Sequence, residues 1–191
     1  ALREAAAEAG VETSALEGVG VGSPGDVDEK TGVVSGARNL PGWDGSFPLG
    51  ATLKGALGVE VRVGNDVQVA TEAEFHLGAG REFQSLIGVF WGTGVGGGLV
   101  LDGKPWLGRG AAGEVGHMVV KRGGAKCPCG RRGCMEAYAG RSAMEAEARR
   151  RHEEEGETTE LFKLMEKHEK PRLTSGIWER AIDANDHLAE D

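Results

Sequence analysis

Residues 113–136 read GEVGHMVVKRGGAKCPCGRRGCME and bring a histidine and every cysteine of the chain into one short stretch. Zinc prefers four thiolate or imidazole ligands in a tetrahedron. Two cysteines one residue apart can share an ion only if the backbone turns sharply, and Pro128, Gly130 and Gly133 favour such a turn. The stretch therefore predicts a zinc site with the ligands His117, Cys127, Cys129 and Cys134. Because protein atoms fill all four positions, the predicted ion is structural and leaves no open position for hydrolytic chemistry.

The number of cysteines supports this interpretation. Three cysteines crowded between Cys127 and Cys134 do not suit a disulfide framework. They suit metal thiolates in a reducing compartment. The alternative is three incidental buried thiols, which the close spacing and the intervening glycines disfavour.

Strands and helices alternate along the sequence before this stretch. Residues 18–22 favour a strand, and leucines at every fourth position over residues 49–57 mark one apolar face of a helix. A strand over residues 59–63 and a helix over residues 67–77 follow, and residues 86–91 are typical of a buried strand. This order is typical of an α/β fold.

Helices, loops and a hairpin account for the other segments. We expect a helix over residues 1–9, a loop over residues 23–48 and a tight turn at Asp102-Gly103 between strands over residues 99–101 and 104–107. Charged helices are predicted after Glu136, over residues 143–155, 159–168 and 175–190.

Glycine is concentrated at places where the backbone must approach another group. The chain has 33 glycines among 191 residues, more than double the usual share of about 7%. Gly92, Thr93 and Gly94 open the segment GTGVGGG between two predicted strands. Unobstructed backbone N–H groups there suit phosphate oxygens, and the threonine adds a hydroxyl. The segment is not a P-loop, since no Gly-Lys-Ser/Thr follows it, and a tight hairpin remains the alternative.

Asn65 and Asp66 lie at the junction of a predicted strand and a predicted helix. Asn and Asp are common helix N-caps, and position alone favours that structural role. A carboxylate at this place could also act as a general base, and an amide both donates and accepts hydrogen bonds.

Together these segments resemble the ROK family of repressors, open reading frames and kinases. The resemblance rests on Gly113-Glu114-Val115-Gly116-His117, on the pattern Cys-x-Cys-Gly-x-x-Gly-Cys-x-Glu that ends at Glu136, on GTGVGGG and on Asn65-Asp66. Ser23-Pro24-Gly25 and residues 39–43 (NLPGW) fit the sugar-side loops of the family. The resemblance covers residues 18–140.

The resemblance implies an actin-like ATPase (ribonuclease H-like) fold, with two α/β lobes, substrate in the cleft and a structural zinc loop. Residues 1–80 would be the remainder of the small N-terminal lobe, with the sugar-side loops and the catalytic aspartate. Residues 81–191 would belong to the larger lobe, with the phosphate loop, the zinc loop and a charged helical tail. The family opens with an Asp-x-Gly-x-Thr phosphate loop and closes with a glycine-rich adenosine-binding segment, and neither is in this sequence. We therefore expect ATP-dependent catalysis to need sequence on both sides of this segment.

The resemblance also implies a role for each matched residue. Asp66 would be the general base, and the sugar ligands would be Gly25, Asn65, Asp66, Glu114, His117 and Glu136. The phosphates of ATP, which enters with Mg²⁺, would bind at Gly92, Thr93 and Gly94. His117 would give one ring nitrogen to zinc and the other to the sugar, so that zinc holds the ring in register. The neighbouring glycines and cysteines disfavour surface exposure of Glu114 and Glu136.

Phosphorylation of a hexose is the function that the resemblance implies. We predict a glucokinase, because NLPGW and GEVGHM are most similar to glucokinase members of the family. Kinases for N-acetylmannosamine, N-acetylglucosamine, fructose or mannose share the core residues, and polyphosphate is an alternative donor to ATP. The alternative from another class is a sugar-sensing repressor core with a DNA-binding domain upstream, and a zinc-stabilised interaction module is the third. Retention of Asp66 and of the glycine segment favours the enzyme.

Charge and hydropathy exclude other classes. The formal net charge of −8 repels nucleic-acid backbones, and the basic group within residues 121–132 is short, so we expect no nucleic-acid binding by this segment. No run approaches the roughly 18 apolar residues of a membrane span. Residues 1–10 carry Arg3, Glu4 and Glu8, which excludes a secretory signal and predicts a cytoplasmic protein without a membrane partner. The family implies a homo-oligomer, either a dimer or a tetramer.

Overall fold

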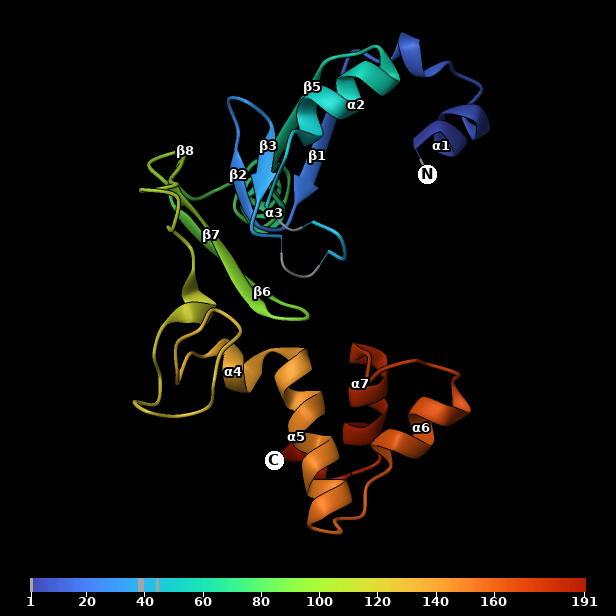
Figure 1. Cartoon of the computed structure of the whole chain (residues 1–191), viewed down its shortest axis with the longest axis vertical. Helices are drawn as coiled ribbons and strands as arrows, with labels where there is room; N and C mark the ends of the chain where they lie inside the picture. The colour runs from blue at the N-terminus through green and yellow to red at the C-terminus, as the bar shows by residue number, and fades with distance from the viewer. Residues whose placement is uncertain (1, 38–39, 44) are drawn as a thin grey trace. The chain divides into compact units, whose positions relative to one another are not determined.

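The computed structural model of the protein describes residues 2–37, 40–43 and 45–191, and the chain forms two compact units. The first unit comprises Ala1–Val89 and Gly97–Gly113, and the second comprises Phe90–Gly96 and Glu114–Asp191. The chain passes from one unit to the other along β6 (Leu86–Trp91) and β7 (Val95–Leu101) (Figure 1).

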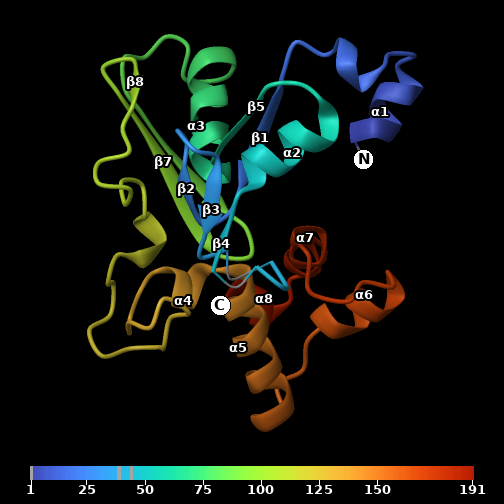
Figure 2. The same ribbon diagram turned by 45° about the horizontal axis from the view of Figure 1, so that its top comes forward.

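A parallel strand pair is the centre of the first unit. β1 (Val19–Ser23) pairs with β5 (Val61–Asn65), so that Ser23 lies opposite Asn65 at the carboxyl ends. α2 (Leu49–Leu57) packs on β5, and α3 (Asp66–Leu77) packs on both strands (Figure 2). The expected strand and helices are confirmed to within a residue, except that β5 lies two residues later than the predicted strand. Helix α1 (Leu2–Glu8) and the 3-10 turn η1 (Thr13–Ala15) precede β1.

A small antiparallel sheet occupies the segment that was expected to be a loop. β2 (Asp26–Asp28), β3 (Val33–Ser35) and β4 (Ser46–Phe47) pair in that order. Val34 of β3 is buried in a small core with Ala37 and Val63. The loop prediction for residues 23–48 was therefore wrong, because strands of two or three residues are too short to show an apolar period and depend on tertiary packing.

The sheet of β6, β7 and β8 (Lys104–Pro105) is half exposed along its first strand. The side chains of Ile87, Val89 and Trp91 are exposed, whereas the alternate residues of β6 are half-buried. The predicted strand lies where it was expected, but the prediction that it is buried was wrong. The uninterrupted apolar run over residues 86–91 conceals the alternation between half-buried and exposed side chains. β8 is also two residues shorter than predicted.

A buried glutamine attaches α3 to β7. Gln68 Nε2 donates to the Leu99 carbonyl at 3.1 Å, and the Leu99 amide donates to Gln68 Oε1 at 3.1 Å. The side chain thus imitates a neighbouring strand and satisfies two backbone groups. A Cβ at Gly98 would lie only 2.4 Å from Thr71 Oγ1, so this strand and helix approach more closely than a side chain would allow.

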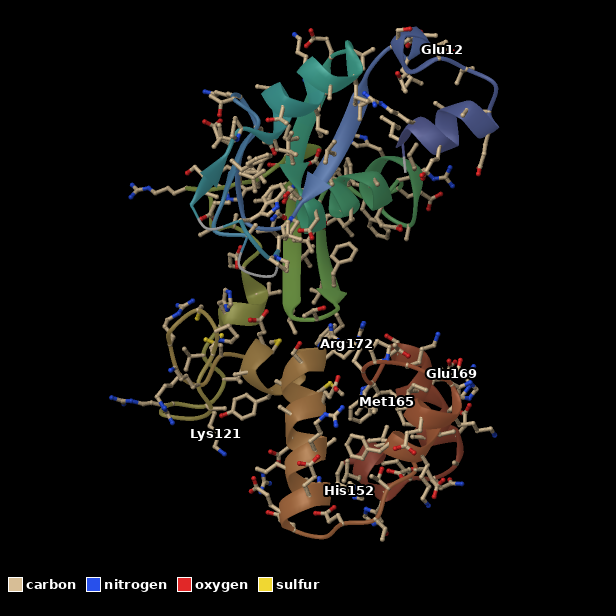
Figure 3. The ribbon with its side chains drawn as sticks, turned by 45° about the vertical axis from the view of Figure 1, so that its right-hand side comes forward. Glu12, Lys121, His152, Met165, Glu169 and Arg172 are labelled. Carbon is tan, nitrogen blue, oxygen red and sulfur yellow. The ribbon has the colours of Figure 1, made fainter. Side chains whose placement is uncertain are left out.

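Helices form the C-terminal part of the second unit. They are α4 (Glu136–Ala139), α5 (Arg141–Glu154), α6 (Leu161–Lys167), α7 (Ser175–Asp183) and α8 (His187–Glu190), preceded by the 3-10 turn η2 (Val115–His117). Their core contains Ala148, Leu161, Leu173, Ile177, Ala181 and Leu188. Figure 3 shows the side chains of His152 and Met165 on the neighbouring helices α5 and α6, and the His152 ring stacks on Phe162. Within the described ranges, no helix has the length and apolar character needed to cross a bilayer.

The predicted single helix over residues 175–190 is divided in two. Asn185 adopts a left-handed conformation with φ +54°, and the Asp186 side chain caps α8 by accepting from the Ala189 amide at 2.9 Å. The Asp186 carboxylate also accepts from the Thr159 hydroxyl and the Glu160 amide, at 3.0 and 2.6 Å. These distant partners explain the break, which the local helical pattern conceals.

Candidate metal centre and active site

The four predicted zinc ligands converge in the second unit. The candidate ligand atoms of His117, Cys127, Cys129 and Cys134 all lie within 4.8 Å of one another. The sulfurs of Cys129 and Cys134 are 3.8 Å apart, and Cys127 Sγ lies 3.6 Å from His117 Nδ1. A tetrahedron with zinc–sulfur bonds of about 2.3 Å has edges of about 3.8 Å. The donor set and its spacing therefore fit one tetrahedral zinc ion.

Backbone hydrogen bonds fold the zinc loop, residues 117–134, around these ligands. Isolated bridges pair Val119 with Cys134 and Lys126 with Arg132. The Cys127 amide donates to the Arg131 carbonyl at 2.9 Å and closes the turn that contains Cys129. Figure 3 shows sulfur atoms in the loop that carries Lys121. A small hairpin therefore holds the three cysteines, whereas His117 lies at the end of the 3-10 turn η2.

Two of the thiols differ in acidity. Burial raises the pKa of the Cys127 thiol to about 12. Hydrogen bonds from the backbone and then the side chain of Arg131 lower the pKa of Cys129 to about 6. Cys129 is thus the more acidic of these two thiols, and a bound metal must displace a proton from Cys127. The role of Arg131 was missed by the sequence analysis, and its position two residues after a cysteine is the only signal for it.

His117 has a different partner on each side of its ring. Nδ1 faces Cys127, and Nε2 lies 3.7 Å from Glu114 Oε2. A carboxylate on the outer nitrogen orients a metal-bound imidazole. The Glu114 side chain is 54% exposed, so the expectation that this residue is shielded was wrong.

Glu136 is half-buried, as expected, and contacts two separate segments. Its Oε2 accepts a hydrogen bond from the Val95 amide at 3.0 Å, and its Oε1 lies 3.8 Å from Cys127 Sγ. The contact to Val95 could not be predicted from residue types, because every residue except proline offers a backbone N–H.

The glycine segment forms the tip of the β6–β7 hairpin. The Gly92 amide donates to the Gly94 carbonyl at 2.9 Å, and β7 begins at Val95, so the second half of GTGVGGG is strand. No described atom lies within 4 Å of the position that a Cβ of Gly92 would take. The tip is therefore a hairpin with open space beside the Gly92 Cα, although the Gly92 N–H is already bonded within the turn.

Gly25, Asn65 and Asp66 lie together in the first unit. Asn65, not Asp66, is the N-cap of α3, because its Oδ1 accepts from the Val67 and Gln68 amides at 3.2 and 3.1 Å. Its Nδ2 donates to the Gly25 carbonyl at 3.2 Å. Gly25 has φ +93°, and a Cβ there would lie 2.5 Å from the Ser35 carbonyl oxygen, so no other residue fits.

Asp66 is exposed in the first turn of α3, and its Oδ1 accepts from the Val67 amide at 3.0 Å. It follows the carboxyl end of β5, and Gly25 follows the carboxyl end of β1. Ligands of α/β proteins bind at the carboxyl ends of parallel strands, so the three residues occupy a favourable place for a substrate. Asn39, in the other predicted sugar-side loop, lies outside the described residues.

Comparison with known proteins identifies the family. Residues 1–183 match the model of the ROK family. The chain belongs to the ROK family. The resemblance noted in the sequence is thereby confirmed, and with it the actin-like ATPase fold of the ROK kinases.

Two curated ROK kinases are similar in sequence. The glucokinase of Thermotoga maritima is 40% identical over 127 residues, which cover 66% of this chain and 40% of that protein. The N-acetylmannosamine kinase of Haemophilus influenzae (strain PittGG) is 34% identical over 174 residues, which cover 91% of this chain and 57% of that protein. The chain thus spans about half the length of these ROK relatives.

Two solved ROK structures are similar in fold. The glucokinase of Streptomyces griseus, crystallised with glucose and AMPPNP, gives a TM-score of 0.78 at 31% identity, covering 98% of this chain and 60% of that one. A ROK family transcriptional regulator, homologous to the E. coli MLC protein, gives 0.76 at 26% identity, covering 98% of this chain and 45% of that one. The ROK fold is therefore shared by kinases and regulators.

Proposed function

We propose that the protein to which this ROK chain belongs is a sugar kinase that transfers the γ-phosphoryl group of ATP to glucose. The observation that carries the proposal is the grouping of Gly25, Asn65 and Asp66 at the carboxyl ends of β1 and β5. The similar glucokinases support glucose as the substrate. We further propose that it acts in the cytoplasm as a homo-oligomer.

Asp66 is the residue that we assign to proton transfer. Its Oδ1 is oriented by the Val67 amide, and Oδ2 takes the proton of the sugar hydroxyl as that oxygen attacks the γ-phosphorus. The bond from phosphorus to the bridging oxygen breaks, and ADP leaves. ATP with Mg²⁺ supplies the phosphoryl group and neutralises its charge, and we assign Gly92, Thr93 and Gly94 to phosphate binding.

The other sugar ligands follow from their remaining hydrogen-bonding capacity. The second N–H of the Asn65 side chain can donate to a sugar oxygen, since the first already donates to Gly25. The carboxylates of Glu114 and Glu136 accept from sugar hydroxyls, and the Nε2 side of His117 also faces the sugar. Zinc on His117, Cys127, Cys129 and Cys134 would be structural and would fix the His117 ring.

A sugar-sensing regulator is the second candidate function. It is supported by the fold similarity to the ROK transcriptional regulator. Both functions require sugar binding, whereas only the kinase requires a phosphoryl donor.

The test is a substrate panel with the full-length protein. Glucose, fructose, mannose, N-acetylglucosamine and N-acetylmannosamine are each incubated with ATP and Mg²⁺, or with polyphosphate, and sugar phosphate is detected by ³¹P NMR. Preferential phosphorylation of glucose by ATP is the expected result. Preference for another sugar or donor would replace the glucokinase assignment, and sugar-dependent thermal stabilisation without turnover would support the regulator. Absence of both effects would contradict both functions.

A further inference from the structure

Glu136 joins two segments that are distant in sequence. Its Oε1 lies 3.8 Å from Cys127 Sγ in the zinc loop, and its Oε2 accepts from the Val95 amide at 3.0 Å, immediately after the glycine tip of the β6–β7 hairpin. The two contacts span 9 and 41 residues of sequence. One carboxylate therefore touches both a candidate metal ligand and the candidate phosphate loop.

The zinc loop determines where this carboxylate lies. Glu136 is the first residue of α4, two positions after Cys134. The Ala137 amide donates to the Cys134 carbonyl at 3.1 Å, and the Met135 amide donates to the Met118 carbonyl at 2.9 Å. A metal ion that fixes Cys134 thus restrains the start of α4, and one that fixes Cys127 restrains the sulfur beside the Glu136 carboxylate.

The hairpin tip is held from two directions. The first amides of α5, those of Arg141 and Ser142, donate to the carbonyls of Gly92 and Thr93 at 3.1 and 3.2 Å. Glu136 holds the other side through the Val95 amide. Hydrogen bonds to an ionised acceptor are roughly twice as strong as neutral ones, so the carboxylate is the strongest of these attachments.

Two glycines lie close to these contacts, and a side chain at either position would displace a neighbour. A Cβ at Gly94 would lie 2.1 Å from Glu136 Oε2, and a Cβ at Gly116 would lie 1.9 Å from the Val95 carbonyl oxygen. Glycine at both positions lets η2 and α4, which flank the zinc loop, approach the β6–β7 hairpin.

We propose that Glu136 is a positioning residue that couples occupancy of the metal site to the conformation of the hairpin tip. The metal restrains the zinc loop, the loop places the carboxylate, and the carboxylate fixes the Val95 N–H and the shape of the Gly92–Gly94 turn. This role is separate from the sugar contact assigned to Glu136 above. Only its consequence for phosphate binding rests on the proposed function.

Amide hydrogen exchange at Val95, followed by NMR without sugar or nucleotide, tests the coupling. The zinc-loaded and chelator-treated forms are compared for the wild type, Glu136→Ala and Glu136→Gln. Loss of a hydrogen bond to a charged acceptor should accelerate exchange of this amide about tenfold or more in Glu136→Ala. Glutamine retains an acceptor oxygen and should give a smaller change. Glu147→Ala, on the exposed side of α5, is the matched control and should leave Val95 unaffected.

The decisive comparison is the response to zinc removal. The wild type should show accelerated Val95 exchange, whereas Glu136→Ala should respond little, because the link is already missing. An equal response in both proteins, or unchanged Val95 exchange in Glu136→Ala, would overturn the proposal. The amides of Ala148 and Ile177 in the helical core report whether a variant is folded. If Glu136→Ala does not fold, Glu136→Gln provides the test. The coupling would be refuted if Val95 exchange in Glu136→Gln equalled that of the wild type and also accelerated to the same extent when zinc is removed.

Kinetics then separate this proposal from the kinase assignment. In an active protein, Glu136→Gln should raise the KM for ATP as well as the KM for the sugar. If Glu136 only bound the sugar, the substitution would raise only the KM for the sugar. A protein that phosphorylates no sugar would contradict the proposed function and leave the exchange result standing. Conversely, a Val95 exchange rate that is unchanged in the Glu136 variants would contradict the coupling, but it would not affect the kinase assignment if turnover is measured.

Discussion

Substitution of Gly133 by alanine tests the packing of the zinc loop. Gly133 is buried beside Cys134, has φ +83°, and a Cβ there would lie 1.7 Å from the Lys121 carbonyl oxygen. Its own amide donates to the Ala125 carbonyl at 2.8 Å, and its carbonyl accepts from the Val120 amide at 2.8 Å. Because the obstacle is backbone that is itself hydrogen-bonded, it cannot move aside without loss of the hairpin.

The magnitude follows from two separable costs. A left-handed conformation costs an L-residue about 1–2 kcal/mol. Overpacking of a tight site adds about 1–3 kcal/mol. Gly130 is the matched control, since it has φ +92° and no described atom lies within 4 Å of the position of its Cβ. Gly130→Ala should therefore show only the first cost, and Gly133→Ala should show both.

The assay is zinc titration in competition with a chromogenic chelator, together with thermal melting. Since zinc binds the folded loop, the additional overpacking cost should weaken the zinc affinity of Gly133→Ala relative to Gly130→Ala by about fivefold to a hundredfold. Equal zinc affinities for the two variants, or a weaker affinity for Gly130→Ala, would refute the reasoning.

Three further predictions concern contacts outside the zinc loop. Gln68→Ala should lower the free energy of unfolding by about 1–3 kcal/mol in denaturant titration, because the Leu99 amide loses its acceptor, whereas the Leu99 carbonyl keeps the Trp106 amide as a donor; a loss below about 0.5 kcal/mol would contradict this. Asp186→Ala should lower the free energy of unfolding by about 2–4 kcal/mol in the same titration, because the Thr159 hydroxyl and the Glu160 and Ala189 amides lose the carboxylate to which they donate. The zinc affinity of this variant should not change. The hydrogen bond from Arg151 lowers the pKa of Glu157 below its ordinary value of 4.5. The pair therefore stabilises the folded state fully when the pH is above 4.5, and this stabilisation is lost as the pH falls through the lowered pKa. Thermal melts of Arg151→Met should accordingly show a shallower acid dependence than those of the wild type, and identical acid profiles would exclude this contribution.

Elements with a long apolar period were predictable from the sequence. The leucines of α2 and the strand–helix junction at Asn65 lie within single elements, and their patterns are local. The short strands β2, β3 and β4 were missed, because the burial of Val34 depends on segments remote in sequence. The break after α7 was also missed, since it depends on the contact of Asp186 with Thr159.

The candidate site also contains features that were predictable from the sequence and features that were not. The four zinc ligands were predictable because cysteine and histidine carry their chemistry in the residue type, and their spacing limits the geometry. The capping role of Asn65 rather than Asp66 required backbone geometry, since either residue type can cap a helix. The contact between Glu136 and the Val95 amide lay beyond reach, because a backbone donor leaves no mark in the sequence.

The most direct test of the account compares binding with turnover in Asp66→Asn of the full-length protein. Calorimetry measures the affinity for glucose, and ADP release with ATP and Mg²⁺ measures the rate. The account predicts that glucose affinity changes by no more than a few-fold, while turnover falls by about 10²–10⁴-fold, the usual contribution of a general base. Turnover within tenfold of the wild type would contradict the assignment of Asp66 as the base, and with it the proposed mechanism.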